Sequence, residues 1–382
     1  MDTFERLGAI KLSDLALLDA SGNGGGTVVI RGGNLLIDNS FISATTQGNR
    51  NGASIGIDIH VTGDMVVTNG ASITTDGFGV GRGGDIRITA GSMEVSNNSV
   101  IGPRAFFGST GDTGDVEITT GSLQVDSASI LTETGGSGSA GDIVIKAGQV
   151  TLTGGAQISS SALGTGSGGT ITITATDSVT IAGHDSEGRS SGLFSNAEGS
   201  GAGGDITVQA SNVQLTDGAV ISATSAGEGN AGTIFIMTEE TFRSDHGLVT
   251  TEARQAGGGN IQLTAGSFVD LLDSQINAIG IASEGNIMIA SKFLILEDSE
   301  LLTNVLGSGG NIRLVADLFL ASSESRVVAS GVLDIQAVTN LSGTLAPLSQ
   351  AFVSAGALLR EPCAVRLRGG QTSSLVFRGR EG

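Results

Sequence analysis

A short pattern of alternating apolar and polar residues returns along nearly the whole chain. Residues 203–232, GGDITVQASNVQLTDGAVISATSAGEGNAG, hold three such runs, at 205–210, 212–216 and 218–223. Alternation with a period of two is typical of a half-buried strand, because successive side chains point to opposite faces. A glycine-rich loop at 224–231 then leads to the next copy. The pattern therefore predicts an all-β chain made of one repeated unit.

Each unit begins with Asp, Asn or Thr after a small residue or glycine. About twelve such markers recur at intervals of roughly 23–35 residues; they are Thr27, Asp58, Asp85, Asp115, Asp142, Thr170, Asp205, Thr233, Asn260, Asn286, Asn311 and, weakly, Asp334. Three short strands bury too little surface alone, whereas stacked units share one continuous core. Parallel crossovers favour the right-handed sense. We therefore expect a right-handed, single-stranded parallel β-helix (solenoid) of about twelve coils of about 27 residues, with three strands per coil and terminal caps.

The repeat divides the chain into three parts. Residues 1–22 are expected to form an N-terminal partial coil or cap, 23–340 the parallel β-helix repeats, and 341–382 a C-terminal capping tail with a helix at 348–360. A longer polar insertion is expected in the unit at 177–202. In the third strand of each unit, small and then branched residues should face the core, as in Ala71/Ile73, Ala156/Ile158, Ala219/Ile221 and Ser274/Ile276.

Composition restricts the classes of partner. The formal net charge of −19 argues against nucleic acid as a partner, because a phosphate backbone requires a basic surface. The single cysteine, Cys363, cannot form an internal disulfide. No apolar run is long enough for a membrane-spanning helix, and Arg6, Lys11 and Asp14 interrupt the first apolar stretches, unlike a signal peptide.

The string GGDITVQASNVQLTDGAVISATSAGEGNAGTI resembles the repeats of large bacterial exoproteins of the filamentous haemagglutinin type, and SSLVFRGREG at 373–382 is similar to their ends. The resemblance covers roughly residues 20–340 and only the carboxyl-terminal stalk of such proteins. It implies a right-handed parallel β-helix and an extracellular or cell-surface location. It also implies two-partner secretion through an outer-membrane pore protein, and a role in adhesion, biofilm formation or contact-dependent competition.

Two polar groups are the best candidates for chemistry. Polysaccharide lyases and hydrolases on this type of fold need clustered carboxylates, as acid and base or as calcium ligands. One candidate group joins Asp185 and Glu187 to His184 and Arg189; the other joins Glu239, Glu240 and Arg243 to Asp245 and His246. We favour the interpretation that both are solvated polar insertions, and we predict no catalytic, cofactor-binding or metal-binding residues.

Three further features have structural interpretations. The histidines His60, His184 and His246 are too far apart in sequence for the local pairs that zinc sites use, and His60 should point outward from a strand. The Asp and Asn markers are expected to hydrogen-bond neighbouring turn backbone in preference to binding calcium. Glycine runs at 24–26 and 257–259 are interpreted as turns that need positive φ, and the arginines at 360–380 as part of a solvated cap.

The favoured function is that of a non-catalytic, adhesin-like stalk whose partner is a glycan or a cell-surface receptor. A polysaccharide-active β-helix enzyme, either a lyase or a hydrolase, and a remnant of a longer exoprotein are the alternatives.

Overall fold

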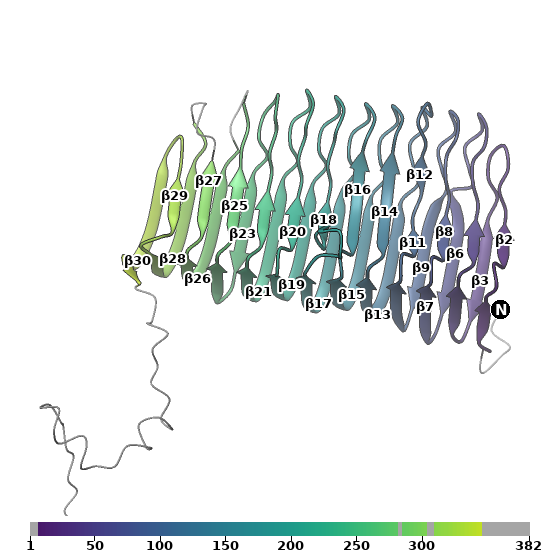
Figure 1. The fold of residues 1–382 in the computed structure, drawn as a ribbon, viewed down its shortest axis with the longest axis horizontal. Coiled ribbons are helices and arrows are strands. Elements are labelled where there is room, and N and C mark those ends of the chain that lie inside the picture. Colours follow the sequence, from purple (N-terminus) through teal and green to yellow (C-terminus); the bar gives the residue numbers. More distant parts are fainter. Residues whose placement is uncertain (1–6, 282–284, 304–308, 346–382) are drawn as a thin grey trace, which may run out of the picture. The chain divides into compact units, whose positions relative to one another are not determined.

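The structure is a computed structural model that describes residues 7–281, 285–303 and 309–345. Within these residues it contains thirty strands and no helix. The strands stack as a β-solenoid of about 11 turns, with about 28 residues and three strands per turn (Figure 1). This confirms the predicted fold class. The weak twelfth marker, Asp334, lies in β30 (Leu333–Leu345), which begins a further turn.

The strands form two parallel sheets. The larger one covers the first and second faces of the solenoid. Its strands are β1 (Ile10–Leu12), β3 (Val28–Gly32), β4 (Leu35–Asp38), β6 (Ile55–Val61), β7 (Asp64–Thr68), β9 (Asp85–Ala90), β10 (Ser92–Ser96), β13 (Val116–Asp126), β15 (Ile143–Thr153), β17 (Ile171–Ala182), β19 (Ile206–Thr216), β21 (Ile234–Asp245), β23 (Ile261–Ala265), β24 (Phe268–Leu272), β26 (Ile287–Glu297), β28 (Ile312–Ser322) and β30.

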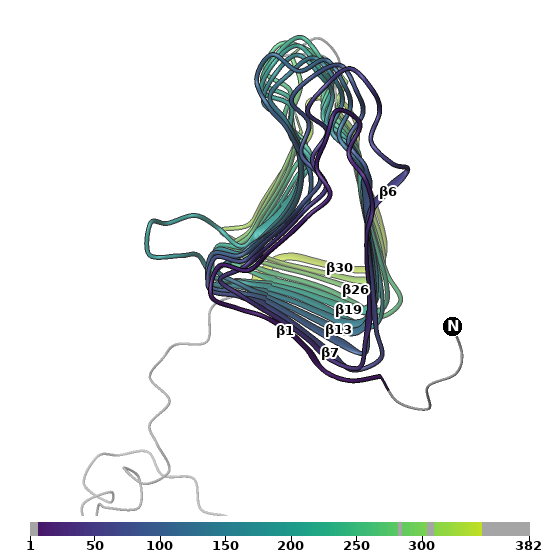
Figure 2. The same cartoon turned by 90° about the vertical axis from the view of Figure 1, so that its right-hand side faces the viewer.

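The smaller sheet is the third face of the solenoid. Its strands are β2 (Leu17–Asp19), β5 (Phe41–Ser43), β8 (Ser72–Thr74), β11 (Val100–Ile101), β12 (Arg104–Ala105), β14 (Ser129–Thr134), β16 (Gln157–Ala162), β18 (Gly192–Phe194), β20 (Val220–Ser222), β22 (Leu248–Thr250), β25 (Gln275–Ala278), β27 (Glu300–Thr303) and β29 (Arg326–Val328). Seen from its N-terminal end, the solenoid winds clockwise away from the viewer and is therefore right-handed (Figure 2).

The corner between the first and second faces differs from the expected break between two strands. In β15, β17 and β19 the chain continues around this corner as one strand of 11 or 12 residues. The ladder shifts register there, for example between Ala147 and Gln149 in the pairing of β15 with β17. Such an irregularity bends a strand and lets it cover two faces without losing its neighbours.

The core follows the predicted alternation. In the unit at 203–232, Ile206, Val208, Val213, Leu215 and Ile221 are all buried. The small-then-branched pairs that were expected to point inward are buried as well: Ala71/Ile73, Ala156/Ile158, Ala219/Ile221 and Ser274/Ile276. Because each side chain stacks on its equivalent in the next turn, one apolar cluster runs through the solenoid.

Polar residues with positive φ make the corner between the second and third faces. They are Asn39, Asn69, Asn97, Asn98, Ser127, Asp217, His246, Asp273 and Asp298, with φ between 43° and 61°. Asn and Asp adopt this left-handed conformation more readily than other residues that have a Cβ. The corner therefore places polar side chains in a column along the solenoid.

Glycines line the place where the chain returns from the loops to the first face. They form a column that runs Gly56, Gly84, Gly114, Gly141, Gly169, Gly204, Gly232, Gly259 and Gly285. From Gly114 onward, a Cβ built on each glycine would lie closer than 3.0 Å to the carbonyl oxygen of the preceding glycine in the column. Real Cβ atoms essentially never come this close. The absence of a side chain therefore lets backbone stack directly on backbone at this column.

This finding corrects the expected reason for the glycine runs. Gly25 does have positive φ, at 51°, as the turn interpretation requires. Gly258 and Gly259 do not, and their added Cβ atoms would instead meet the backbone of Ile279 and Gly232. Close approach of backbone is therefore the constraint in the second run.

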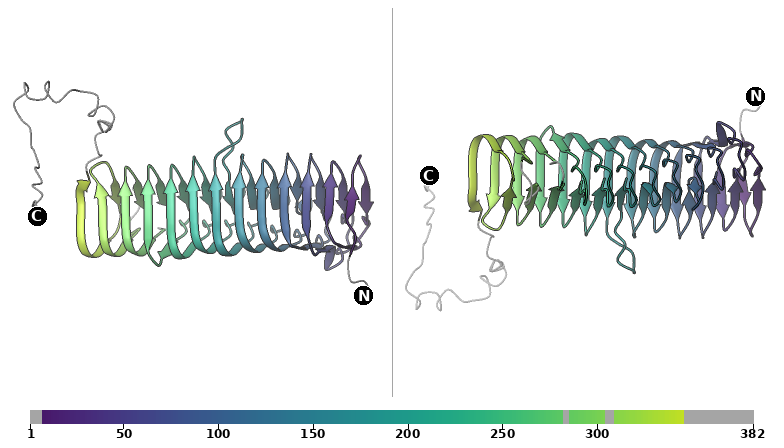
Figure 3. Two further views of the ribbon diagram at one scale, coloured as in Figure 1. Left: turned by 90° about the horizontal axis from the view of Figure 1, so that it is seen from below. Right: turned by 90° about the horizontal axis from the view of Figure 1, so that it is seen from above.

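The glycine-rich loops repeat regularly as well. They stack into a ridge, named here the loop ridge, at the top of Figure 2. Parallel bridges join successive loops in it, from Gly77 to Ala105 and from Ala197 through Ser225 to Ala253. The longest unit contains one true insertion, the hairpin 183–191, which projects from the corner between the second and third faces (Figures 2 and 3).

The ends of the described solenoid differ slightly from the expected boundaries. The partial coil expected at 1–22 supplies β1, which pairs with β4, and β2, which pairs with β5. At the other end β30 continues past 340, the expected boundary, to Leu345. The helix expected at 348–360, Cys363 and the rest of the predicted capping tail lie outside the described residues.

The glycine column can be tested with Gly204→Ala. The added methyl group must displace the backbone at Gly169, so the free energy of unfolding should fall by about 1–3 kcal/mol. Thermal unfolding followed by circular dichroism measures this loss. Gly22→Ala is the matched control, because a Cβ at Gly22 has nothing within 4 Å. Equal melting temperatures for the two variants would contradict the backbone-stacking explanation.

Candidate functional site

The hairpin 183–191 holds its shape through Asp185. The carboxylate accepts hydrogen bonds from the backbone N–H groups of Glu187 and Arg189, each at 2.9 Å, and from Nε of Arg189 at 2.7 Å. Gly183 and Gly188 supply positive φ at its two turns. The backbone hydrogen bond from Arg189 is the main cause that lowers the pKa of Asp185, helped by the Arg189 guanidinium. Asp185 is therefore an ionised structural residue of the hairpin.

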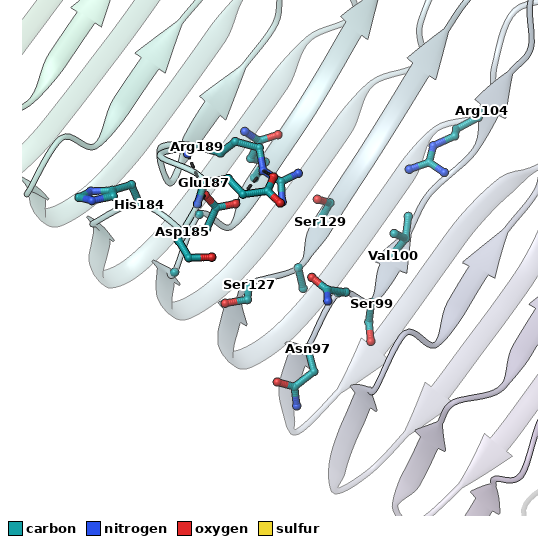
Figure 4. A pocket seen from close by; sticks show the side chains of 16 residues that line it. Asn97, Ser99, Val100, Arg104, Ser127, Ser129, His184, Asp185, Glu187 and Arg189 are labelled. Atoms are coloured by element: carbon teal, nitrogen blue, oxygen red, sulfur yellow. Dashed lines mark hydrogen bonds and ion pairs between the residues drawn. The ribbon is translucent and has the colours of Figure 1, made fainter.

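The hairpin forms one wall of an open groove on the third face. It rests on the preceding turn, where the N–H of Gly155 donates to Ser191 Oγ at 3.0 Å. The groove has a volume of about 800 Å³ and extends from the hairpin across β16, β14 and β11 to Arg104 (Figure 4). Its lining is Asn97, Asn98, Ser99, Val100, Arg104, Ser127, Ala128, Ser129, Gly154, Gly155, Gln157, His184, Asp185, Ser186, Glu187 and Arg189. Volumes of this size are usual for ligand sites.

The lining of the groove is mainly polar. Its lining contains two carboxylates, Asp185 and Glu187, and both contact Arg189, with Glu187 at 3.7 Å. Glycoside hydrolysis needs two carboxyl groups that face each other across the scissile bond. Here both acids lie on one hairpin, on the same wall, so their arrangement does not match that requirement. Amide and hydroxyl groups make up most of the polar lining.

The structure separates the second predicted group, at 239–246. Glu239 and Glu240 lie at the corner between the first and second faces, whereas Asp245 and His246 lie at the next corner, about 16 Å further along the strand at 3.3 Å per residue. Arg243 points outward between them and pairs with Asp270 of the next turn at 3.1 Å. The five residues therefore do not form one site.

His246 contacts the adjacent Asp245 and also Asp273 of the next turn, which its sequence neighbourhood did not reveal. Its Nδ1 lies 2.5 Å from Asp245 Oδ1, and its Nε2 lies 3.7 Å from Asp273 Oδ2 on the next turn. The hydrogen bond with Asp245 is the main cause that raises the pKa of His246 above 6.5, and the charges of Asp245, Asp273 and Asp217 add to it. The stabilisation from the protonated ring is thus complete below about pH 6.5 and is lost as the pH rises through the pKa of the folded state.

An NMR titration of the His246 imidazole should give a midpoint above 6.5. Asp245→Asn should lower that midpoint, because it removes the charge that stabilises the imidazolium ion. Asp270→Asn is the matched control, since Asp270 pairs with Arg243 instead. A midpoint that does not respond to Asp245→Asn would contradict the assigned pairing.

The Asp and Asn markers have the turn role that the sequence predicted. Seven of the nine Asp and Asn markers accept a hydrogen bond from a backbone N–H of the following turn, for example Asp115 from Asp142 at 2.8 Å, Asp205 from Thr233 at 2.7 Å, and Asn286 from Asn311 at 3.0 Å. Burial raises the pKa of Asp115, and Arg82, at 2.9 Å, partly offsets this effect. His60 lies at an outward position of β6, as expected.

The marker column can be tested at Asp205. Asp205→Ala removes the acceptor for the Thr233 N–H and should lower the free energy of unfolding by about 1 kcal/mol. Asp205→Asn keeps an acceptor oxygen and should cost less. Thermal unfolding with calcium and with a chelator measures both effects. A calcium-dependent increase in melting temperature that Asp205→Ala abolishes would contradict the turn role.

Exposed phenylalanines are a feature that the sequence analysis missed. The rings of Phe78 and Phe106 stack on the loop ridge with centroids 4.5 Å apart and 6° between their planes. Phe268 and Phe293 stack on the second face at 4.8 Å. The signal available in the sequence was that these residues occupy outward positions of the repeat. Large exposed apolar groups often mark contact surfaces.

Comparison with known proteins identifies no relative: no family model, no curated protein and no solved structure matches the chain. Across the described ranges, no three His, Cys, Asp or Glu side chains are grouped so that they could hold a metal ion. The same part of the chain has no helix long and apolar enough to cross a membrane.

Proposed function

We propose that this chain is a non-catalytic, adhesin-like stalk that binds an external surface through the groove beside the hairpin 183–191. The observation that carries the proposal is which groups the two carboxylates of the groove contact. Asp185 is hydrogen-bonded within the hairpin, and Glu187 lies against the same arginine, Arg189. The lining therefore offers hydrogen bonds to a ligand without a second carboxylate on the opposite wall.

The outward faces of the solenoid support the same proposal. On the first face, charges of opposite sign follow one another from turn to turn: Arg31 pairs with Asp58 at 2.5 Å, Arg87 with Glu117 at 3.1 Å, and Lys146 with Glu117 at 3.7 Å. Each of these exposed side chains is thus neutralised by a partner of opposite charge on a neighbouring turn along the solenoid axis. They suit a scaffold that presents a surface, which is the usual role of repeat proteins.

The cellular setting is part of the proposal. The resemblance to filamentous haemagglutinin-type exoproteins favours a bacterial protein that acts outside the cell or on its surface. In such a setting, an outer-membrane pore protein would export the protein that carries these repeats. Adhesion to a glycan or a cell-surface receptor, or contacts within a biofilm, would then be the function of the stalk.

A binding assay with the full chain tests this function. We expect retention on cells, on immobilised glycans or on biofilm matrix, without release of reducing ends from a panel of polysaccharides. Asp185→Asn separates the two classes, because it weakens the hairpin but removes any acid chemistry at that residue. Reducing-end release that Asp185→Asn abolishes would establish the enzyme alternative. Failure to bind any of the three kinds of surface would contradict the adhesive function.

A further inference from the structure

An aromatic surface lies two residues along the chain from Arg104, at the end of the groove away from the hairpin. Arg104 lines that end and begins β12. The N–H of Phe106 still bonds to the carbonyl of Gly77, so the ladder extends through this residue. Because side chains two residues apart in an extended segment share a face, Arg104 and Phe106 point to the same side, about 6.6 Å apart along the chain.

Phe106 and Phe78 form a face-to-face stack of phenyl rings there, named here the platform. Their rings are nearly parallel, and the residues are 41% and 54% exposed. Their neighbour Phe107 is 97% exposed. Exposed phenyl rings are costly in water unless they serve a contact, and a ring face accepts the C–H-rich face of another flat ring. The exposed outer surface of this stack is suited to pack against one ring of a ligand that lies in the groove.

The floor of the groove offers regularly spaced hydrogen-bonding groups. Ser129 and Gln157 occupy the same outward column on successive turns, together with Val100. Successive turns lie about 4.8 Å apart, so the groove from the hairpin to Arg104 is about 14 Å long. Such a floor fits an elongated ligand with hydroxyl groups on successive rings better than a single small molecule.

The charges of the groove compensate one another. Arg189 pairs with Asp185 and lies near Glu187. Arg104 lies in one column between Asp76, whose Oδ1 accepts its backbone N–H, and Glu133 of the next turn. The lining thus carries no concentrated positive charge, and the whole chain carries a formal charge of −19. A polyanionic ligand would therefore be repelled.

We infer that the groove and the platform together bind a neutral oligosaccharide, with ring hydroxyls on Ser129 and Gln157 and one sugar ring packed against the exposed side of the Phe78–Phe106 stack. This inference deepens the proposed adhesive function and rests on it. The ligand class follows from three observations of different kinds: a polar floor, an aromatic platform and compensated charge. Each of them belongs to residues outside the repeating core.

Calorimetric titration of the full chain tests the inference with two sets of probes. One set is neutral hexasaccharides of glucose, galactose and mannose, and the other is hexagalacturonate. We expect at least one neutral probe to bind and hexagalacturonate to bind more weakly. Gln157→Ala and Phe106→Ala should each raise the Kd about tenfold, because each removes one of the two recognition elements.

The repeat provides a matched control for each variant. Gln275 occupies the same outward column of the third face as Gln157. Phe293 belongs to the second stacked phenylalanine pair. Gln275→Ala and Phe293→Ala should leave the Kd unchanged within about twofold, and circular dichroism should show all four variants folded.

Three outcomes would overturn the inference. They are an absence of neutral binding while cells or matrix still retain the chain, a preference for hexagalacturonate, and equal losses in the control variants. The first of these leaves the adhesive function standing. If neither the hexasaccharides nor any surface is bound, both the inference and the proposed function fail.

Discussion

The close stacking of backbone on backbone, turn after turn, is the constraint on which the rest of this structure depends. Parallel hydrogen bonds fix the spacing of successive turns at about 4.8 Å, so every residue must fit beneath its equivalent in the next turn. Where two loops meet without room for a Cβ, the column from Gly84 to Gly285 is glycine throughout. Where there is room, isoleucine, valine and leucine fill one narrow core. Insertions are consequently confined to corners, and the hairpin 183–191 occurs at one of them.

Most of the fold could be predicted because it depends on local alternation and on its repetition. The period of two identifies inward residues such as Ile206 and Val208 without reference to distant parts of the chain. What the pattern could not reveal was the strands that continue around a corner, since β15 and β19 show the same alternation whether or not they break there. The sequence also could not show why residues 257–259 are glycines, because the backbone of Gly259 lies directly against that of Gly232 in the preceding turn.

The candidate site was only partly predictable, for a related reason. The polar stretch around Asp185 was recognised as an insertion, and its residues do lie together. The stretch 239–246 looked like a cluster because its residues are close in sequence, but an extended strand separates Glu239 from His246 across a whole face. Conversely, Gln157, Ser129 and Arg104 come from different turns and line the same groove as the hairpin, at sequence distances that reflect the repeat length. Two residues of a solenoid lie close together when they occupy equivalent positions in neighbouring repeats. The type of a single residue does not reveal that position.

The direction of the backbone hydrogen bonds also determines how such a solenoid carries mechanical load. The bonds of both sheets run between turns and hence along the axis, so tension along that axis is shared by all the bonds at one junction at the same time. The share is unequal, because β17 contributes 12 residues to the bent sheet, whereas β18 contributes three to the third face. The third face therefore resists tension less than the bent sheet does. A ligand that binds across several turns of the third face would strengthen the contacts between those turns.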